Sequence, residues 1–365
     1  MNYYIIAGEA SGDLHASNLI KELKVLDENA QFRCWGGDLM KEQGAVLVKH
    51  YRELAFMGFT EVLMNLRTIL RNIDFCKKDI LQNKPDVLIL VDYPGFNLRI
   101  AEYAKTIGIK VFYYISPQIW AWKQSRIHKI KRVVDKMFVI LPFEKEFYQR
   151  FDFDADFVGH PLLDAVADYS NQQSTLSAKT DKPIIALLPG SRKQEISTIL
   201  PLMLSMQKQF TDFQFIIAGA PSQSEEFYQK FISGTDVQIV FNQTYQLLQK
   251  AEVALVTSGT ATLETALFGV PEVVCYKGGA ISYAIAKQLV KVKYISLVNL
   301  IMDKEIVKEL IQNELNETNL KVELDKLLNP ETRNKLLADY AELTLKLGGS
   351  GASKITAGLM INYLK

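Results

Sequence analysis

Along the first 165 residues, short continuous apolar runs alternate with segments in which apolar residues recur at a helical period. Continuous runs rich in Val, Ile and Tyr predict strands that are buried on both faces, at residues 3–7, 87–91, 111–115 and 137–140. Between the first two runs an amphipathic helix is predicted, because six apolar side chains share one helical stripe: Val62, Leu63, Leu66, Ile69, Leu70 and Ile73. Strands that alternate with helices pair in parallel through right-handed crossovers, so this half predicts a doubly wound sheet.

The same alternation returns in the second half, after a polar stretch at residues 168–175 that is typical of a linker. Further apolar runs predict strands at residues 184–188, 213–218, 237–241, 253–257 and 272–276. The tail from Pro330 onward has a helical pattern, which a glycine cluster at 348–351 interrupts. We therefore expect two α/β domains, residues 1–167 and 180–345. A C-terminal helix, residues 346–365, would then cross either to the first domain or to a partner chain.

Composition narrows the class of protein. The 365 residues carry 42 Lys and Arg against 41 Asp and Glu, and a near-zero net charge argues against a protein that coats nucleic acid. Cys34, Cys76 and Cys275 stand far apart, which predicts buried free thiols and neither a disulfide framework nor a structural zinc site. The longest stretch without Asp, Glu, Lys or Arg has thirteen residues, 237–249, whereas a membrane-spanning helix needs about 20. With no signal-peptide pattern, we expect a soluble or surface-bound protein of a reducing compartment.

The loops that follow the predicted strands are the first candidates for a site, because ligands in open α/β sheets bind beyond the carboxyl ends of the strands. The loop after the first strand carries Gly8, Glu9, Ser11, Gly12 and Asp13. It leads into a predicted helix, whose first N–H groups suit an anion or a sugar hydroxyl. Its spacing is not the GxGxxG dinucleotide fingerprint, and a plain strand-to-helix turn fits it equally well.

Asp92 directly follows the second predicted strand. A carboxylate at the end of a buried, wholly apolar strand either caps the next helix or acts on a ligand, and spacing alone slightly favours capping. In an enzyme that activates an alcohol, a partly desolvated Asp92 would serve as a general base.

Aromatic and basic residues gather after the third predicted strand. Trp120 and Trp122 stand next to six basic residues: Lys123, Arg126, Lys129, Lys131, Arg132 and Lys136. Asp135 is the acidic residue that opposes them in this segment. A solvated helix face explains the pattern as well as an interfacial patch does, in which Trp would lie at the headgroups and Lys and Arg would reach phosphates.

Two loops of the second half carry residue types that suit a nucleotide diphosphate. One follows the strand at 184–188 and contains Gly190, Ser191 and Arg192. The other follows the strand at 253–257 and contains Ser258, Gly259 and Thr260. Glycine lets the backbone approach closely, Arg offers a planar fork to phosphate oxygens, and a helix N-terminus favours negative charge. Glu264 lies about one helical turn further on, where it could accept hydrogen bonds from a ribose.

Other motifs carry less weight. Residues 152–156 contain the DxD spacing of metal-dependent sugar-nucleotide enzymes, but they lie in an acidic, aromatic connection that we expect at the surface. The four histidines show no metal-ligand spacing, so no metal site is predicted. The sequence has neither a GxSxG nucleophile elbow nor a Walker-type lysine.

Together these motifs resemble those of the lipid-A-disaccharide synthases, bacterial glycosyltransferases of GT-B architecture, over nearly the whole chain. The matching segments are residues 7–13, 56–62, 92–97, 116–122, 141–144, 159–161, 188–192 and 258–264. Each is weak alone, but the ordered set is highly specific. Gly95 departs from the pattern, since the family often carries a second Asp there, whereas Asp92 matches. The resemblance implies two Rossmann-like, doubly wound parallel-sheet domains that face a cleft, with a C-terminal helix that is able to cross back to the first domain.

The resemblance also implies a reaction. UDP-2,3-diacylglucosamine would be the donor and 2,3-diacylglucosamine 1-phosphate the acceptor, giving a β-1,6-linked disaccharide phosphate and UDP with inversion, without a metal or other cofactor. Asp92 would be the base for the acceptor hydroxyl, on the side of the Gly8–Asp13 loop. Arg192 and the loop at 258–260 would hold the diphosphate and Glu264 the ribose. Asn299, which matches another polar position of the family, would orient the donor phosphates.

Lipid substrates imply that the protein is located at the cytoplasmic face of a Gram-negative inner membrane, to which it would bind peripherally. Acyl chains or the membrane surface would be contacted by Phe56, Met57, Phe59 and the stripe through Ile73. Phosphate or anionic headgroups would be met by the patch of Trp120, Trp122, Lys129 and Arg132. The expected partners are the two lipid substrates and the membrane, with no nucleic acid and with a homodimer through the C-terminal segment.

Three other functions are weighed against this one. A UDP-GlcNAc 2-epimerase would share the two sheets and the UDP site, but it needs no acyl pocket. A nicotinamide-dependent oxidoreductase is disfavoured, because neither sheet begins with GxGxxG and a later acidic residue. A non-catalytic membrane adaptor would leave the loops around Arg192 and Glu264 unexplained.

Overall fold

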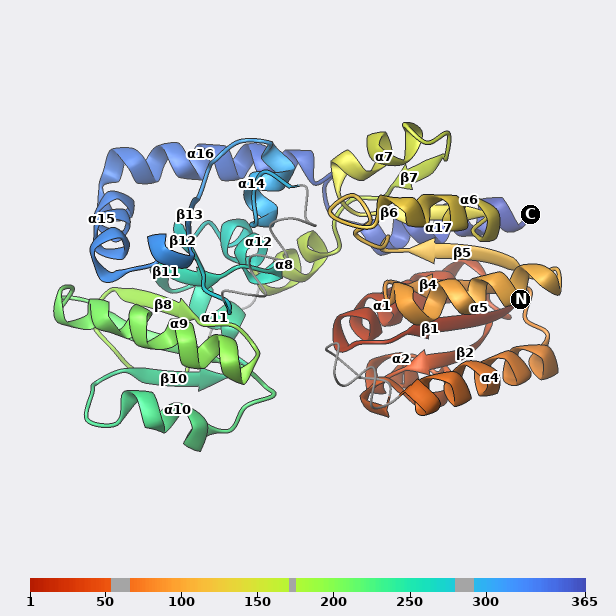
Figure 1. Cartoon of the computed structure of the whole chain (residues 1–365), viewed down its shortest axis with the longest axis horizontal. Coiled ribbons are helices and arrows are strands. Elements are labelled where there is room, and N and C mark those ends of the chain that lie inside the picture. Colours follow the sequence, from red (N-terminus) through yellow and green to blue (C-terminus); the bar gives the residue numbers. More distant parts are fainter. Residues whose placement is uncertain (54–65, 171–174, 280–291) are drawn as a thin grey trace. The chain divides into compact units, whose positions relative to one another are not determined.

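The computed structural model describes residues 1–53, 66–170, 175–279 and 292–365 (Figure 1). They divide into two compact units, each with its own sheet. Unit 1 comprises Met1–Pro161 and Leu347–Lys365, and unit 2 comprises Leu162–Lys346. The division therefore falls ahead of the polar stretch at 168–175, whose residues 171–174 lie outside the described part.

In the described residues, the sheet of unit 1 has seven parallel strands in the order β3-β2-β1-β4-β5-β6-β7. The strands are β1 (Asn2–Ala7), β2 (Gln31–Gly36), β3 (Val46–His50), β4 (Val87–Val91), β5 (Lys110–Tyr114), β6 (Lys136–Val139) and β7 (Ala155–Phe157). Strand β4 is paired on both sides, with β1 and β5. Its alternate residues enter two different cores, because side chains of a strand point to opposite faces: Leu88 and Leu90 pack on one side, Ile89 and Val91 on the other.

The helices of unit 1 cover both faces of this sheet. They are α1 (Ala10–Leu26), α2 (Asp38–Glu42), α4 (Leu66–Asn83), α5 (Pro94–Thr106), α6 (Ile127–Val133), α7 (Pro142–Gln149) and α17 (Ala352–Leu364), with 3₁₀ turns η1 (Tyr51–Glu53) and η2 (Gln124–Arg126). Of the predicted amphipathic stripe, Ile73 is buried and Ile69 packs against the core, whereas Leu70 is exposed. Residues 54–65, and with them Phe56, Met57 and Phe59, lie outside the described residues.

The C-terminal helix belongs to unit 1, which confirms that it crosses back (Figure 1). Ala357 and Met360 of α17 are fully buried in the same core as residues of α1. The Tyr363 hydroxyl donates to Asp156 of β7 at 3.0 Å, and the Lys136 ammonium lies 4.0 Å from the centre of the Tyr363 ring.

Unit 2 repeats the plan with six parallel strands in its described part, in the order β10-β9-β8-β11-β12-β13. The strands are β8 (Ile184–Leu188), β9 (Gln214–Gly219), β10 (Gln238–Phe241), β11 (Ala251–Thr257), β12 (Glu272–Tyr276) and β13 (Lys308–Ile311). The helices are α8 (Leu162–Ser170), α9 (Lys193–Ser205), α10 (Glu225–Ile232), α11 (Thr244–Leu248), α12 (Thr260–Leu267), α14 (Leu297–Met302), α15 (Glu317–Leu328) and α16 (Pro330–Lys346), with 3₁₀ turns η3 (Met206–Lys208) and η4 (Gln312–Glu314).

Each sheet reverses its strand order once, between β1 and β4 in unit 1 and between β8 and β11 in unit 2. The connections on the two sides of such a switch point leave in opposite directions, which opens a crevice at the carboxyl ends of these strands. The four loops that follow β1, β4, β8 and β11 are those that the sequence marked as candidates.

All nine predicted strands are confirmed, and the described residues contain four further strands that were not predicted. Of these four, β3, β7 and β13 are sheet edges. Strand β2 contains Arg33, whose guanidinium pairs with Asp79 at 2.6 Å. Each of these strands mixes charged with apolar residues, so none forms a continuous apolar run. The expectation that residues 152–156 form a surface connection is wrong in part, because β7 begins at Ala155.

Candidate active site

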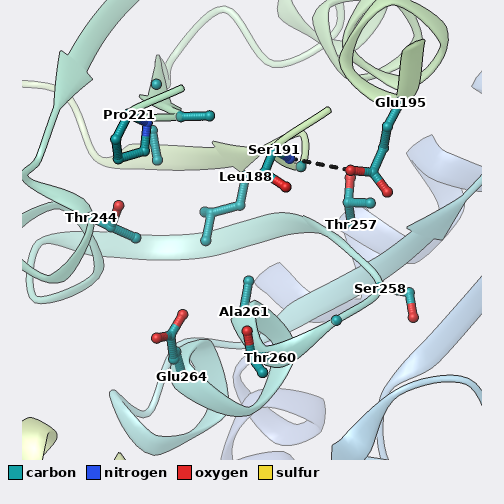
Figure 2. Close-up of a pocket in the computed structure, with 15 residues that line it drawn as sticks. Leu188, Ser191, Glu195, Pro221, Thr244, Thr257, Ser258, Thr260, Ala261 and Glu264 are labelled. Carbon is teal, nitrogen blue, oxygen red and sulfur yellow. Dashed lines mark hydrogen bonds between the residues drawn. The ribbon is translucent and has the colours of Figure 1, made fainter. Parts of the chain in front are cut away.

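A pocket of about 250 Å³ opens at the switch point of unit 2 (Figure 2). The loops after β8, β9 and β11 and the first turns of α12 form its walls. Five of the predicted donor residues line it: Ser191, Ser258, Gly259, Thr260 and Glu264. Residues that are up to 73 positions apart in the sequence thus meet in one concave site, as the argument from strand ends predicted.

The loop after β8 is shaped by Gly190, which has φ +100°, a conformation that L side chains rarely adopt. A Cβ at this position would collide with the carboxylate of Glu195, which also lines the pocket. The Ser191 N–H donates to Glu195 Oε2 at 3.2 Å (Figure 2). Arg192 is the N-cap residue of α9 and its side chain is exposed, at a helix end that favours anions.

The loop after β11 places a second helix N-terminus at the pocket. Gly259 is the N-cap residue of α12 and has φ +151°. The Ser258 hydroxyl donates to the carbonyl of Ile295 at 3.0 Å, which leaves its oxygen lone pairs as acceptors. Gly259 and Thr260 are exposed, so a ligand can approach this backbone closely.

Glu264 supplies a carboxylate to the same pocket (Figure 2). It comes from α12, and its Oε1 accepts a hydrogen bond from the Tyr245 hydroxyl at 2.9 Å. Burial raises the pKa of Glu264, and the bond from Tyr245 acts in the opposite direction. A carboxylate beside two helix N-termini can accept hydrogen bonds from hydroxyl groups while the N–H groups hold an anion.

The contacts of Asn299 leave little hydrogen-bonding capacity for the role expected of it. Its side chain is fully buried and forms four hydrogen bonds within the protein. The amide donates to Val307 O and Glu309 Oε1, both at 2.9 Å, and its oxygen accepts from the N–H groups of Ile306 and Val307. These bonds join α14 to β13. They occupy the N–H donors and the oxygen of the amide, so few hydrogen-bonding positions remain for donor phosphates.

Unit 1 brings Asp92 to its own switch point, at the end of β4. Asp92 has φ +44° and Tyr93 has φ +49°, a costly pair of left-handed residues. The Asp92 carbonyl is held by the Tyr113 hydroxyl at 2.5 Å and by the Asn97 amide at 2.7 Å. These bonds use the backbone and leave the half-buried carboxylate available.

Glu9 lies close enough to Asp92 to act on it electrostatically. Burial, with the charge of Glu9 as the second cause, raises the pKa of Asp92 to about 6. Gly8 allows this approach, because a Cβ there would collide with the Tyr93 ring. The loops after β1 and β4 thus approach each other, and they bring a second carboxylate for which the sequence indicated no separate role.

The other members of the first loop differ in their surroundings. Ser11 is exposed, and Gly12 is buried, where an added Cβ would meet Ala7 closely. Asp13 is also buried, and its carboxylate accepts from the N–H groups of Gly37, Leu39 and Met40 at 2.7 to 3.2 Å. Asp13 therefore caps α2, and the expectation that it serves the acceptor is not supported by its contacts.

Trp120 and Trp122 also differ from each other in their burial and contacts. Trp120 is half-buried, and its indole N–H donates to Glu144 Oε1 at 3.1 Å. Trp122 is 42% exposed, with Lys123 Nζ 4.3 Å and Arg126 Cζ 5.7 Å from its ring centre. Trp120 thus packs inward, against its predicted role in membrane contact, whereas Trp122 presents an aromatic surface beside two cations.

Lys129 and Arg132 do not form an unopposed basic surface. Both contact Glu102 of α5, with N···O distances of 2.8 and 3.9 Å. Within the segment itself Asp135 is the opposing charge. Glu102 lies on a different helix, 27 residues before Lys129, so the segment's own sequence does not reveal it.

Glu144 is a buried carboxylate that the sequence marked only as part of a motif. It accepts from the Ser116 hydroxyl at 2.6 Å, from Trp120, and from the N–H groups of Ile140 and Leu141. Burial raises its pKa to about 7, against the effect of these bonds. Glu144 ties the loop after β5 to the start of α7.

The described residues offer neither a metal cluster nor a membrane-spanning helix. Within them, no cluster of three or more His, Cys, Asp or Glu side chains is arranged to hold a metal ion. Among the helices described here, none is both long and apolar enough to cross a membrane.

Comparison with known proteins agrees with the site. Residues 3–359 match the family described as lipid-A-disaccharide synthetase. The lipid-A-disaccharide synthase of Syntrophus aciditrophicus is 40% identical over 99% of this chain and 97% of that protein. The synthase of Geobacter metallireducens is 38% identical over 99% of this chain and 96% of that protein.

Solved structures resemble the chain in fold. A UDP-GlcNAc 2-epimerase from Neisseria meningitidis, bound to UDP-GlcNAc, has a TM-score of 0.70 at 15% identity and covers 99% of this chain and 100% of its own. The glycotransferase of kitacinnamycin has a TM-score of 0.68 at 14% identity, covering 100% of this chain and 99% of its own. These likenesses show the GT-B architecture, while the sequence relatives decide between the activities found on it. The chain belongs to the lipid-A-disaccharide synthase family, the glycosyltransferases of lipid A biosynthesis.

Proposed function

We propose that this chain transfers a diacylglucosamine unit from UDP to the 6-hydroxyl of diacylglucosamine 1-phosphate. The donor is an α-glycoside and the product is β-1,6-linked, so the anomeric centre inverts. The observation that carries the proposal is the pocket of unit 2, where two helix N-termini and a carboxylate converge. The Neisseria epimerase, which shares the fold, is described as bound to UDP-GlcNAc.

The donor diphosphate would bind the N-termini of α9 and α12. The backbone around Ser191, the loop from Ser258 to Thr260 and the helix dipoles offer N–H groups and positive potential. Arg192, exposed at the same helix end, would pair with phosphate oxygens as UDP departs. We infer a metal-independent reaction, because these groups would supply the positive charge that the leaving diphosphate needs. Glu264 would accept hydrogen bonds from the ribose.

Asp92 would act as the general base. Its carboxylate takes the proton of the acceptor 6-hydroxyl while that oxygen forms a bond to the anomeric carbon. The bond from this carbon to the diphosphate oxygen breaks, and its electron pair leaves with UDP. A pKa of about 6 suits this role, since the group is mostly ionised at neutral pH and still accepts a proton readily.

We further propose that the protein binds the cytoplasmic face of the inner membrane peripherally, where its lipid substrates would be found. Exposed Trp122, with Lys123 and Arg126 over its ring, supports an interfacial contact with phosphate headgroups. A homodimer through the C-terminal segment stays a prediction, although α17 already fills a core within its own chain.

The test is UDP release from purified protein given UDP-diacylglucosamine, with and without diacylglucosamine 1-phosphate, in detergent and EDTA. We expect release that depends on the acceptor and survives the chelator. Acceptor-dependent release that EDTA abolishes would contradict metal independence alone. UDP binding without release would contradict the proposed acceptor or the transfer itself, and an altered UDP-sugar would then indicate an epimerase.

A further inference from the structure

Tyr245 contacts the carboxylate of Glu264, which lines the pocket of unit 2. It lies on α11, and its hydroxyl donates to Glu264 Oε1 at 2.9 Å, so it links α11 to α12. Its neighbour Thr244 lines the pocket (Figure 2). Because the hydroxyl occupies one side of Oε1, Oε2 and the remaining lone pair of Oε1 are left for a ligand.

The Tyr245 ring is held by packing from two other elements. The ring of Tyr169, on α8, meets it edge-on with centroids 4.9 Å apart, and Phe268, just after α12, lies at 5.0 Å. The Gln249 amide donates to the backbone carbonyl of Tyr169 at 2.8 Å, which holds that part of α8 against α11. The hydroxyl that reaches Glu264 is therefore preorganised, and it limits how the carboxylate can rotate.

The bond also favours the ionised form of Glu264. Burial raises the pKa of this carboxyl, and the Tyr245 hydroxyl is the group that lowers it. Two further titratable side chains lie nearby in the described residues: Tyr169 packs against Tyr245, and Glu195 lines the same pocket. An ionised carboxylate accepts two O–H donors at once, whereas a protonated one must donate with one of its oxygens. A vicinal diol is the ligand group that presents two adjacent O–H donors.

We propose that Tyr245 is a positioning residue that holds Glu264 as a fixed double acceptor for the vicinal diol of a ribose. Tyr245 thereby sets the preference of the pocket for a ribonucleotide over a 2′-deoxyribonucleotide. The inference rests on the proposed function, in which this pocket binds UDP.

The experiment is calorimetric binding of UDP and of 2′-deoxyuridine diphosphate to the wild-type chain and to Tyr245→Phe. The wild-type chain should prefer UDP. In Tyr245→Phe, UDP binding should weaken about tenfold, the size expected when a hydrogen bond to a charged group is lost. Binding of the deoxynucleotide should hardly change, because that ligand lacks one of the two hydroxyls.

Two variants separate this role from a structural one. Tyr340→Phe removes another buried tyrosine hydroxyl of unit 2, from a side chain outside the pocket lining, and should leave both affinities unchanged. Glu264→Gln should lose the ribose preference by itself, and adding Tyr245→Phe to it should cost nothing more. Thermal unfolding of each variant confirms that it is folded.

The pH dependence of UDP affinity gives an independent test of the role of Tyr245. UDP affinity should fall as the pH drops through the pKa of Glu264. In Tyr245→Phe this fall should occur at higher pH, because the bond that lowers the pKa is gone. The ionisation of UDP itself is common to every variant and cancels from the comparison.

Equal losses for UDP and the deoxynucleotide would overturn the inference, as would an unchanged ribose preference in folded Tyr245→Phe. Either result leaves the proposed function standing, since the wild-type chain binds UDP. A wild-type chain that binds neither nucleotide would overturn the proposed function and this inference together.

Discussion

At the scale of single residues, the surroundings of Asp92 separate it from the other acidic side chains near the strand ends. Its backbone carbonyl is fixed by Tyr113 and Asn97, while the half-buried carboxylate lies near the charge of Glu9 and accepts a hydrogen bond from the Tyr93 backbone. The carboxylate of Asp13, by contrast, accepts hydrogen bonds from three backbone N–H groups. Of these two side chains, Asp92 has the surroundings that suit proton transfer.

Replacement of Asp92 by Asn should lower the turnover rate by about 10²–10⁴-fold, the usual contribution of general-base catalysis. UDP binding and the melting temperature should change little, because the bonds that hold this turn use the Asp92 carbonyl. Turnover with purified lipid substrates and calorimetric UDP binding would measure both. A folded Asp92→Asn protein with near-normal turnover would contradict the assignment.

The charge of Glu9 should be visible in the pH profile. In the wild-type chain the rate should rise through about pH 6 as Asp92 ionises. Glu9→Gln removes a negative charge that raises the pKa of Asp92, so the acid limb of the profile should move to lower pH. The measurement is kcat against pH for both proteins. An acid limb that stays in place would show that Glu9 does not act on the base.

Asp13 should behave as a structural residue. Asp13→Ala removes the acceptor of three N–H groups at the start of α2 and should cost about 1–3 kcal/mol of unfolding free energy. Turnover per folded molecule should stay close to that of the wild-type chain. Ser11→Ala, at an exposed position of the same loop, is the matched control and should leave stability unchanged. Normal stability with lost turnover would instead place Asp13 at the substrate.

At the scale of elements, the segment from η2 to α6 is a mixed surface. Its cations divide into two groups: Lys123 and Arg126 lie over the exposed ring of Trp122, whereas Lys129 and Arg132 face Glu102. The attraction of the second pair to an anionic surface is therefore reduced by a carboxylate from a neighbouring helix, which the segment's own sequence does not reveal.

Binding to anionic vesicles should distinguish the two groups. Neutralising Lys123 and Arg126 together, each as Gln, should weaken binding about tenfold or more, since each cation near such a surface contributes about 1 kcal/mol. The matched pair Lys129→Gln with Arg132→Gln should have a smaller effect. Vesicle sedimentation at two salt concentrations would measure this. Salt-insensitive binding, or equal effects of the two pairs, would contradict the proposed contact.

At the scale of the whole molecule, unit 1 depends on a helix from the other end of the chain. Helix α17 buries Ala357 and Met360 against the core that β1 and α1 share. Unit 1 is therefore complete only when the chain has returned from unit 2 at Leu347.

Truncation of Met360 measures this dependence. Met360→Ala removes a fully buried side chain and should cost about 2–5 kcal/mol. Ile355→Ala, on the same helix at a side chain that is 43% exposed, should cost much less. Thermal or urea unfolding would compare them. Equal and small costs would mean that α17 is not part of the folded core of unit 1.

The sequence by itself determined nine of the strands, the alternation with helices and the loops that bear the candidate residues. These features are encoded locally, since a doubly buried strand requires a continuous apolar run and a ligand loop directly follows its strand. The edge strands β3, β7 and β13 and the interior strand β2 were missed, because each carries a charged side chain and so lacks a continuous apolar run.

The tertiary structure alone decided which polar side chains remain available for a ligand. Asp13 meets the amides of Gly37 to Met40, Asn299 meets Glu309, and Tyr245 meets Glu264. Each pair is separated along the chain, and its members are brought together by sheet pairing and helix packing. A hydrogen bond within the protein consumes the same donor or acceptor that a substrate would use, so the chemistry of each side chain was settled by neighbours distant in sequence.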